Sequence, residues 1–404
     1  MPVPRAMTRP SSPVHLRQVR TGNFQAVLLE MLDGPASRAE LAQRTGLTKA
    51  TVASLVEPLL QQQILAEGVV VNTGHGRPSR PLHFAAAGPV AIGAEINVRH
   101  LAVTAQRLDG STEFEQRIEV NNRHAAAADI VPRLAGLIRT AIAACGRDPL
   151  GIGLAVPGIV QDGVVVHTPN MPGLNGIRPG DQLAVGLGRP AANVAVDNEA
   201  NLAALAHVWP HRLSGNDFVY VSGDVGIGAG IVIGGAMFRG RSGFAGELGH
   251  VTIARPGRPC PCGSHGCVEQ YAGLHAILRT AGKRDLAALL HALDQGDTRA
   301  LTAVANAGAA LGAALASLIN ICDIATVVLG GSYAALFDHL APGVRTELGT
   351  GVLAAARRPT QLTVSAFGSA AVTRGAAALI TRRCCLEPNL LLPPSRLAVA
   401  DERR

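Results

Sequence analysis

Cys260, Cys262 and Cys267 lie within eight residues of one another, in a loop that also contains glycine and proline. The chain has seven cysteines, and an odd number with this clustering does not indicate a disulfide framework. Zn²⁺ prefers four thiolate or imidazole ligands in a tetrahedron. His250, ten residues before the cluster, and His265, inside it, can supply the imidazole. The spacing predicts a structural metal site, because four protein ligands leave no open position for catalysis.

A second group, near the N-terminus, has the residue types of a DNA-binding surface. Thr48 is a helix-capping residue, and Lys49, Thr51 and Ser54 are polar side chains in the turns that follow it. A recognition helix contacts base edges near its N-terminus. Arg77 stands between a glycine and a proline, and such a guanidinium suits a narrow minor groove. We therefore expect these five residues to contact double-stranded DNA.

A helix-turn-helix is the arrangement that would position these side chains. Ser37 and Glu40 form a capping box at the start of a short helix, and Gly46 provides the turn after it. Apolar spacing and the turn residues predict three helices, at about 24–32, 38–45 and 48–62.

A glycine-rich basic segment follows the predicted helices. Strands at 68–71 and 81–84 are expected to flank residues 72–80, which makes a β-hairpin wing with Arg77 at its tip. Residues 1–84 hold nine Lys or Arg and five Asp or Glu, so over half of the net charge of +7 falls in a fifth of the chain. A protein-interaction module or a generic helical bundle is the alternative for such a domain, but the turn, the polar face and the basic wing together favour DNA.

From residue 89 the pattern changes to strands and longer helices. Two strand-rich blocks, each followed by helices, suggest a duplicated α/β architecture with a cleft. The expected elements are strands at 91–95, 100–108, 113–120, 150–156 and 218–222, a helix at 125–145, and long helices after 269. The apolar stretch Ala303–Ile321 is more typical of a buried helix than of a membrane span. No apolar signal core follows the N-terminal arginines, so we expect a cytoplasmic protein.

From about residue 20 to 385 the chain resembles the ROK family (repressors, open reading frames and kinases). The motifs that carry the resemblance, in order, are Val156-Pro-Gly158, Pro169-Asn-Met-Pro-Gly173, Asp197-Asn-Glu-Ala-Asn201, Gly226-Ile-Gly-Ala-Gly230, Gly246-Glu-Leu-Gly-His250, Cys260-Pro-Cys-Gly-Ser-His-Gly-Cys267-Val-Glu269 and Leu329-Gly-Gly331. The resemblance implies an α/β protein in which a winged helix-turn-helix is joined to an actin-like, two-lobed domain of the sugar-kinase and Hsp70 type. It also implies a sugar in the central cleft, a zinc site and homo-oligomers.

The resemblance assigns residues to these sites. The implied sugar-binding residues are Gly158, Asn170, Asn198, Glu199, Glu247, His250 and Glu269. His250, and not His265, matches the family's zinc ligand, so the implied Zn²⁺ ligands are His250, Cys260, Cys262 and Cys267. One ring nitrogen of His250 would then bind zinc and the other would face the sugar, and the metal would fix the ring orientation.

Three departures from the family's kinases argue against catalysis. Their Asp-x-Gly-Gly-Thr turn is replaced here by Glu95-Ile-Asn-Val-Arg99, which lacks the glycines that admit phosphate. Their second phosphate motif begins Gly-Thr-Gly, whereas this chain has Asp224, Val225 and Gly226. Their catalytic aspartate is Glu199 here, and its longer side chain displaces the carboxylate. We expect no catalytic residues, with Glu199 a degenerate base position.

The sequence thus predicts a sugar-responsive transcriptional repressor that is not an enzyme. Its expected partners are operator DNA, a sugar or sugar-phosphate effector and further copies of itself, as a homodimer or homotetramer, without a membrane. One alternative is an ATP-dependent ROK sugar kinase, and another is a DNA-binding protein whose sensor no longer binds sugar. The predicted parts are a tail at 1–20, a winged helix-turn-helix at 21–84, a ROK domain at 85–386 and a tail at 387–404.

Overall fold

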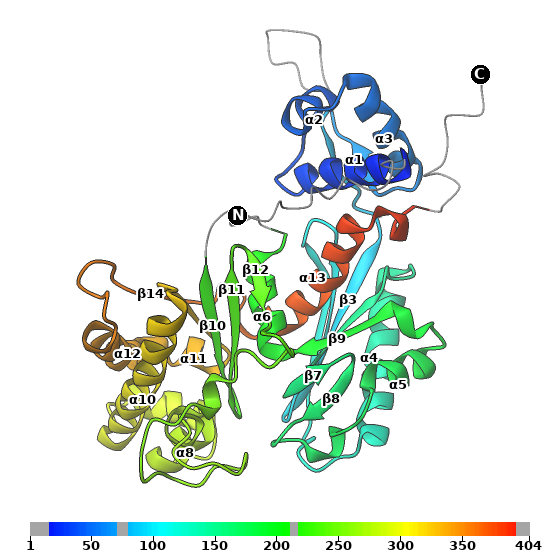
Figure 1. Cartoon of the computed structure of the whole chain (residues 1–404). Coiled ribbons are helices and arrows are strands. Elements are labelled where there is room, and N and C mark those ends of the chain that lie inside the picture. Colours follow the sequence, from blue (N-terminus) through cyan, green and yellow to red (C-terminus); the bar gives the residue numbers. More distant parts are fainter. Residues whose placement is uncertain (1–15, 71–79, 211–216, 393–404) are drawn as a thin grey trace, which may run out of the picture. The chain divides into compact units, whose positions relative to one another are not determined.

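The computed structural model describes residues 16–70, 80–210 and 217–392, and the chain divides into two units (Figure 1). The first comprises the residues up to Gly88 together with those from Arg383 onward, and the second comprises Pro89–Arg382. Helices and strands occur in both units, which confirms the predicted α/β class.

The helices of the first unit begin and end at capping residues. Ser37 Oγ accepts a hydrogen bond from the Glu40 amide at 3.2 Å, and the Glu40 carboxylate accepts one from the Ser37 amide at 2.7 Å. Gly46 ends the second helix with a φ of 72°, and Thr48 caps the third. The predicted capping box and helix-turn-helix are therefore present. The helices are α1 (Leu16–Met31), α2 (Arg38–Thr45) and α3 (Lys49–Gln61), so α1 begins within the tail predicted for residues 1–20.

A two-stranded sheet completes the described part of this unit. Antiparallel β1 (Leu65–Glu67) and β2 (Leu82–Phe84) pair with Leu65 opposite Phe84. The strand predicted at 68–71 is wrong, since the first strand lies three residues earlier. Leu65 is buried in the core whereas Val69 is 86% exposed, so the valine-rich run has β propensity but no surface to pack against. The predicted wing tip, including Arg77, lies outside the described residues.

Residues near the C-terminus also pack in the first unit. The side-chain amide of Gln25 in α1 donates a hydrogen bond to the carbonyl of Leu386, and the 3₁₀ turn Pro388–Leu390 contacts α1. Pro388 and Leu392 are buried. The tail predicted for 387–404 therefore begins later, because residues up to 392 belong to packed structure.

The second unit contains two five-stranded sheets of the same topology, which is the predicted duplication. Their strand orders are β5-β4-β3-β6-β9 and β12-β11-β10-β13-β14. In each, three neighbouring strands form an antiparallel meander and two more are added in parallel. The strands are β3 (Val90–Ile96), β4 (His100–Arg107), β5 (Thr112–Glu119), β6 (Ile152–Val156), β9 (Val194–Asn198), β10 (Phe218–Gly223), β11 (Ile227–Ile233), β12 (Ala236–Phe238), β13 (Thr326–Gly330) and β14 (Gln361–Val364), with a separate hairpin of β7 (Ile159–Gln161) and β8 (Val164–His167).

Each five-stranded sheet, together with the helices that cover it, forms one lobe of the second unit with its own hydrophobic core. The first lobe contains the sheet with β3, and the second lobe contains the sheet with β10. In the first lobe the covering helices are α4 (Ala127–Cys145) and α5 (Pro179–Leu187). The second lobe has α7 (Glu269–Ala272), α8 (Leu274–Ala281), α9 (Leu286–Asp294), α10 (Thr298–Cys322), α11 (Ser332–Ala335) and α12 (Phe337–Gly351). Helix α6 (Glu199–Val208) contacts strands of both sheets, and α13 (Ala371–Leu386) returns to the first sheet. A Cβ at Gly93 would lie 1.8 Å from the Thr373 carbonyl, so only glycine permits this approach of α13.

One helix in the described part of the chain, α10, is long and apolar enough to cross a membrane. Over half of its most apolar window (56%) is buried inside the fold, and it packs against α8 and α12. These contacts are those of a core helix, as the sequence predicted.

Candidate sugar and metal site

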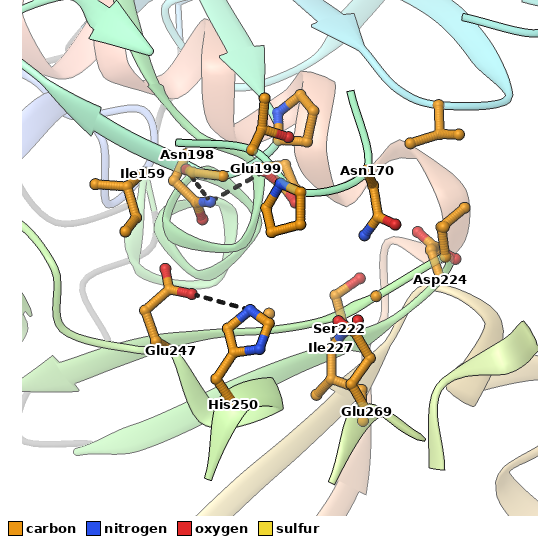
Figure 2. Close-up of a pocket in the computed structure, with 18 of the residues that line it drawn as sticks. Ile159, Asn170, Asn198, Glu199, Ser222, Asp224, Ile227, Glu247, His250 and Glu269 are labelled. Atoms are coloured by element: carbon orange, nitrogen blue, oxygen red, sulfur yellow. Dashed lines mark hydrogen bonds and ion pairs between the residues drawn. The ribbon is translucent and has the colours of Figure 1, made fainter. Parts of the chain in front are cut away.

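A cavity of about 340 Å³ lies between the two lobes of the second unit (Figure 2). Gly158, Asn170, Asn198 and Glu199 reach it from the first lobe and from the start of α6, and Glu247, His250 and Glu269 reach it from the second lobe. The structure therefore brings all seven residues of the predicted sugar site to one cavity.

The turns that hold these residues have local causes. Gly158 has a φ of 88°, and a Cβ there would lie 2.3 Å from the His167 carbonyl. Asn198 caps α6: its Oδ1 accepts hydrogen bonds from the amides of Ala200 at 2.8 Å and Asn201 at 3.2 Å. Its Nδ2 donates to the Gly158 carbonyl at 2.9 Å and to Glu199 at 3.0 Å. Asn198 thus links the two segments and fixes Glu199 at the cavity wall.

Carboxylates dominate the chemistry of the cavity. Burial raises the pKa of Glu199 well above its ordinary value, and the nearby carboxylates of Glu95, Glu247 and Asp224 raise it further. Burial also raises the pKa of Glu247, against the opposing effect of His250. Hydroxyl groups of a sugar can donate to such oxygens and so satisfy acceptors that burial removes from water.

Several lining residues were not predicted from the sequence. His167 and Thr168 directly precede the Pro169–Gly173 motif, and Asn97 and Ser222 follow or end strands of the two sheets. Their position next to recognised motifs was the available signal. Asp224 was noticed only as a departure from the kinase pattern, and it too lines the cavity (Figure 2).

Asp224 and the turn at 95–99, where the sequence departs from the kinase pattern, have hydrogen-bond partners within the protein. Asp224 Oδ1 accepts hydrogen bonds from the amide of Ser332 at 3.0 Å and from its hydroxyl at 2.9 Å, next to the Leu329–Gly331 motif. In the turn at 95–99, Asn97 Nδ2 donates to Glu95 at 3.2 Å, and Asn97 Oδ1 accepts from the Arg99 amide. At both of these departures from the kinase pattern, the side chains thus form hydrogen bonds within the protein.

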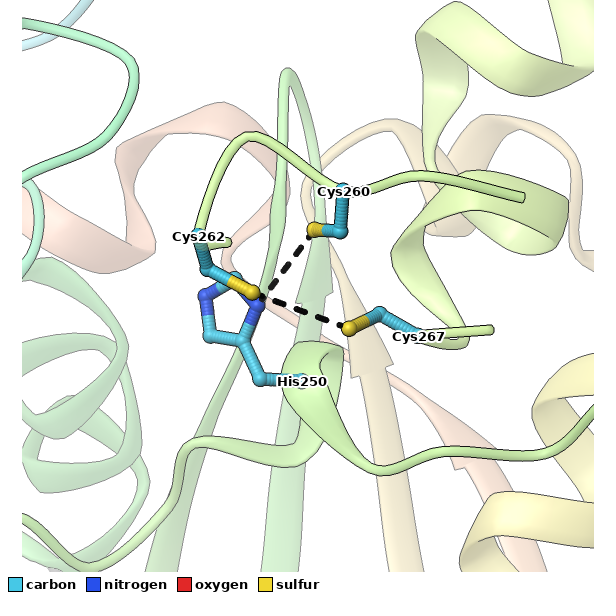
Figure 3. A group of neighbouring side chains, drawn as sticks. All are labelled: His250, Cys260, Cys262 and Cys267. Atoms are coloured by element: carbon cyan, nitrogen blue, oxygen red, sulfur yellow. Dashed lines mark hydrogen bonds between the residues drawn. The ribbon is translucent and has the colours of Figure 1, made fainter. Parts of the chain in front are cut away.

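The predicted metal ligands form one cluster (Figure 3). The ligand atoms of His250, Cys260, Cys262 and Cys267 all lie within 4.8 Å of one another. Cys262 Sγ is 3.7 Å from Cys267 Sγ, and His250 Nδ1 is 3.8 Å from Cys260 Sγ. Tetrahedral bonds of ~2.3 Å to zinc place two sulfur ligands roughly 3.8 Å apart, so the cluster fits that ion.

His250 connects the metal cluster to the cavity. Its Nδ1 faces the thiols, and its Nε2 lies 3.8 Å from Glu247 on the cavity side. His265, the alternative ligand, does not join the group of four. The arrangement has the geometry that the sequence predicted for a shared histidine.

In the first unit, the predicted DNA-contacting residues cluster at the start of α3. Lys49 and Ser54 are exposed, and the hydroxyls of Thr48 and Thr51 hydrogen-bond each other at 2.8 Å. Arg38 and Arg80, which were not predicted, both form ion pairs with Glu67, at 2.8 and 3.2 Å. Lys49 is thus an exposed cation at the start of α3, whereas Arg38 and Arg80 are paired with a carboxylate.

Comparison with known proteins shows the family to which the chain belongs. The ROK family model matches residues 91–383, and the chain belongs to the ROK family. It is 30% identical to the xylose repressor of Bacillus subtilis over 376 residues, which is 90% of this chain and 95% of the relative. The crystal structure of a ROK family transcriptional regulator, a homologue of the Escherichia coli Mlc protein, covers 94% of this chain and 99% of its own at 25% identity and a TM-score of 0.76.

A kinase of the family matches a smaller part of the chain. The glucokinase of Halalkalibacterium halodurans is 30% identical over 259 residues, which is 58% of this chain and 77% of the enzyme. The match to the xylose repressor spans 90% of this chain, which is more than the part of the chain that follows Gly88. This match therefore includes part of the first unit. The predicted family and the predicted architecture, a winged helix-turn-helix joined to a sugar-kinase-like actin fold, are confirmed.

Proposed function

We propose that this protein is a transcriptional repressor whose affinity for operator DNA changes when a sugar binds between the lobes of the second unit. The observation that carries the proposal is one chain holding a helix-turn-helix and a cavity lined by the family's sugar-binding residues. The similarity to xylose repressors over 90% of the chain supports the same assignment.

The cavity supplies a physical basis for the response. Residues from both lobes line it, so a sugar that bridges Asn170 and Glu269 favours one arrangement of the lobes over another. In a homodimer or homotetramer, two recognition helices must lie about 34–36 Å apart to enter successive major grooves. Lobe rotation that alters this spacing lowers operator affinity, and coupling of about 5–150-fold is usual for such systems.

The Lys49→Ala variant is expected to bind operator DNA more weakly, with the salt slope reduced by about one. Lys49 is exposed at the start of α3, where it can reach the DNA. A fluorescence-anisotropy titration over several salt concentrations measures both effects, with a ligand selected from a random duplex pool. Arg77→Ala is expected to weaken binding by about 1–3 kcal/mol and to relax A·T preference.

The matched control is Arg133→Ala, which removes one exposed cation from α4 in the second unit. It should leave DNA affinity unchanged. Equal effects of the Lys49 and Arg133 substitutions would reduce the proposed interface to a nonspecific charge effect and contradict the helix-turn-helix assignment.

The second candidate, a sugar kinase, is favoured by the relationship to glucokinases. Asp224 and the turn at 95–99 oppose it, because they depart from the phosphate motifs of the family's kinases and their side chains hydrogen-bond within the protein. With ATP, Mg²⁺ and a sugar that it binds, the protein is expected to form no sugar phosphate above background. A coupled assay with the Halalkalibacterium glucokinase as positive control tests this, and turnover of ~1 s⁻¹ or more would support the kinase.

A structural zinc ion at His250, Cys260, Cys262 and Cys267 is part of the proposal. Four protein ligands complete a tetrahedron, and the ion would hold the His250 ring at the cavity wall. A cytoplasmic location agrees with this function, because the cytoplasm keeps thiols reduced and contains the operator DNA.

A further inference from the structure

An ion pair between Arg239 and Asp197 connects the two lobes of the second unit. Arg239 directly follows β12 of the second lobe, and Asp197 lies in β9 of the first lobe. Nη1 of the guanidinium donates to Oδ1 of the carboxylate at 2.9 Å, and Nη2 donates to Oδ2 at 2.6 Å. Two charge-assisted hydrogen bonds of this kind fix both the distance and the orientation of their partners. The Asp197 side chain is only 9% exposed, so water competes little for the pair.

Asp197 directly precedes Asn198 and Glu199, which line the sugar cavity. Successive side chains of a strand point to opposite faces, and Asp197 lines a different cavity, of about 470 Å³, together with Arg239. Oδ1 of Asp197 also accepts a hydrogen bond from the Asn198 amide at 2.8 Å. The ion pair therefore holds the segment that carries the sugar-binding residues of the first lobe, although neither of its side chains lines the sugar cavity.

The backbone of Arg239 holds the corresponding segment of the second lobe. Its carbonyl accepts a hydrogen bond from the Ala245 amide at 3.2 Å, which closes the loop that leads to Glu247. The end of this loop is attached to β11, because the Gly246 carbonyl accepts a hydrogen bond from the Ala229 amide at 3.1 Å. Arg239 thus connects the two segments that carry sugar-binding residues, one through its side chain and the other through its backbone.

We propose that Arg239 is a positioning residue of the sugar site, whose ion pair with Asp197 sets the separation between the sugar-binding groups of the two lobes. The inference rests on the proposed function, because it concerns the same cavity. Figure 2 shows Asn198 and Glu199 on one side of the cavity and Glu247 on the other. A sugar has to reach both sides at once, with hydrogen bonds of about 2.5–3.0 Å between oxygen atoms. Without the ion pair, the two segments lose their fixed separation, and ordering them on binding costs part of the affinity.

Calorimetric sugar titrations of four full-length proteins test the inference: the parent, Arg239→Gln, Asp197→Asn and the double variant. The probes are D-xylose, D-glucose, D-mannose and N-acetyl-D-glucosamine, and the sugar that the parent binds most tightly is used for the series. We expect each single variant to bind it roughly tenfold more weakly, which is within the usual coupling between residues in contact. The double variant should bind about as weakly as a single variant, because the first substitution already breaks the pair.

Support of the fold by each side chain separately gives a different pattern. The two losses of affinity would then multiply in the double variant, and the positioning role would be overturned. Arg239→Gln leaves the Asp197 carboxylate buried without its counter-charge, which destabilises the fold. Arg239→Lys keeps the charge without the planar fork, so it should fold and bind the sugar with intermediate affinity. Parental affinity in this lysine variant would overturn the argument from bidentate geometry.

Arg241→Ala is the matched control, since Arg241 lines the same 470 Å³ cavity two residues further on. Its side chain is exposed and forms no ion pair with another described residue, so this variant should bind sugar like the parent. Equal losses in the Arg239→Gln and Arg241→Ala variants would reduce the effect to a general loss of positive charge and overturn the inference. A parent that binds sugar no better than Arg239→Gln does would overturn the inference alone. A parent that binds none of the four sugars would overturn the proposed sugar response, and the inference with it.

Discussion

Glu247→Ala is expected to abolish the response of operator binding to sugar and to leave operator binding by the sugar-free protein intact. Glu247 lines the cavity and makes one described ion pair, at 3.8 Å with His250, so its removal costs the fold little. Sugar affinity depends on the Glu247 carboxylate, which accepts hydrogen bonds from the sugar hydroxyls. A sugar that binds both arrangements of the lobes equally well cannot shift the equilibrium between them. The parent's coupling of roughly 5–150-fold should fall to about one.

Titration of labelled operator with and without saturating sugar measures both quantities in one experiment. Glu115→Ala is a matched control, because it removes an exposed carboxylate of β5 that is not among the residues lining the cavity. The hypothesis fails if the Glu247 variant still responds like the parent. It also fails if a folded Glu247 variant no longer binds operator, since the cavity would then act on DNA binding without sugar.

Cys267→Ser is expected to remove the bound metal, from one zinc ion per chain to none. The Cys267 side chain is fully buried and contributes one of four ligands, so a hydroxyl there leaves an incomplete tetrahedron. The loss of a metal belongs to the largest effects of single substitutions, and we expect roughly 3–5 kcal/mol lower unfolding free energy. Sugar affinity should fall as well, because His250 loses the ion that orients its ring.

Elemental analysis and denaturant unfolding measure the two effects. Cys322→Ser provides the control, since this half-buried thiol at the end of α10 lies outside the cluster. Parent protein that contains no zinc when freshly purified would refute the metal assignment. A Cys267 variant that retains the ion would refute the ligand set.

Local chemistry made much of the fold predictable from the sequence. Ser37, Glu40, Gly46 and Thr48 each satisfy or end a helix within a few residues, so the boundaries of α2 and α3 followed directly. The first wing strand was misplaced because β propensity does not reveal which side of a hairpin finds a core. The packing of residues 383–392 in the first unit includes long-range contacts with α1, such as that between Gln25 and Leu386, which no local pattern encodes.

The candidate sites also combine features that the sequence predicts with features that only the folded chain reveals. Motifs of the family identified seven residues, and the structure places all of them at one cavity. The pairing of Asp224 with Ser332 joins residues 108 positions apart, so the sequence revealed an unusual residue but not what it binds. The absence of lysine and arginine from the described lining likewise depends on the whole set of loops that meet there.

The two ends of the chain share one unit, and this has a consequence for biosynthesis. Helix α1 is synthesised long before its contacts at Leu386 and Pro388–Leu390. A nascent chain that already carries α2 and α3 therefore lacks part of the packing around α1 until these residues have been added. A stop codon before position 386 would damage the first unit as well as α13, although Gln25 and Leu386 are 361 residues apart in sequence.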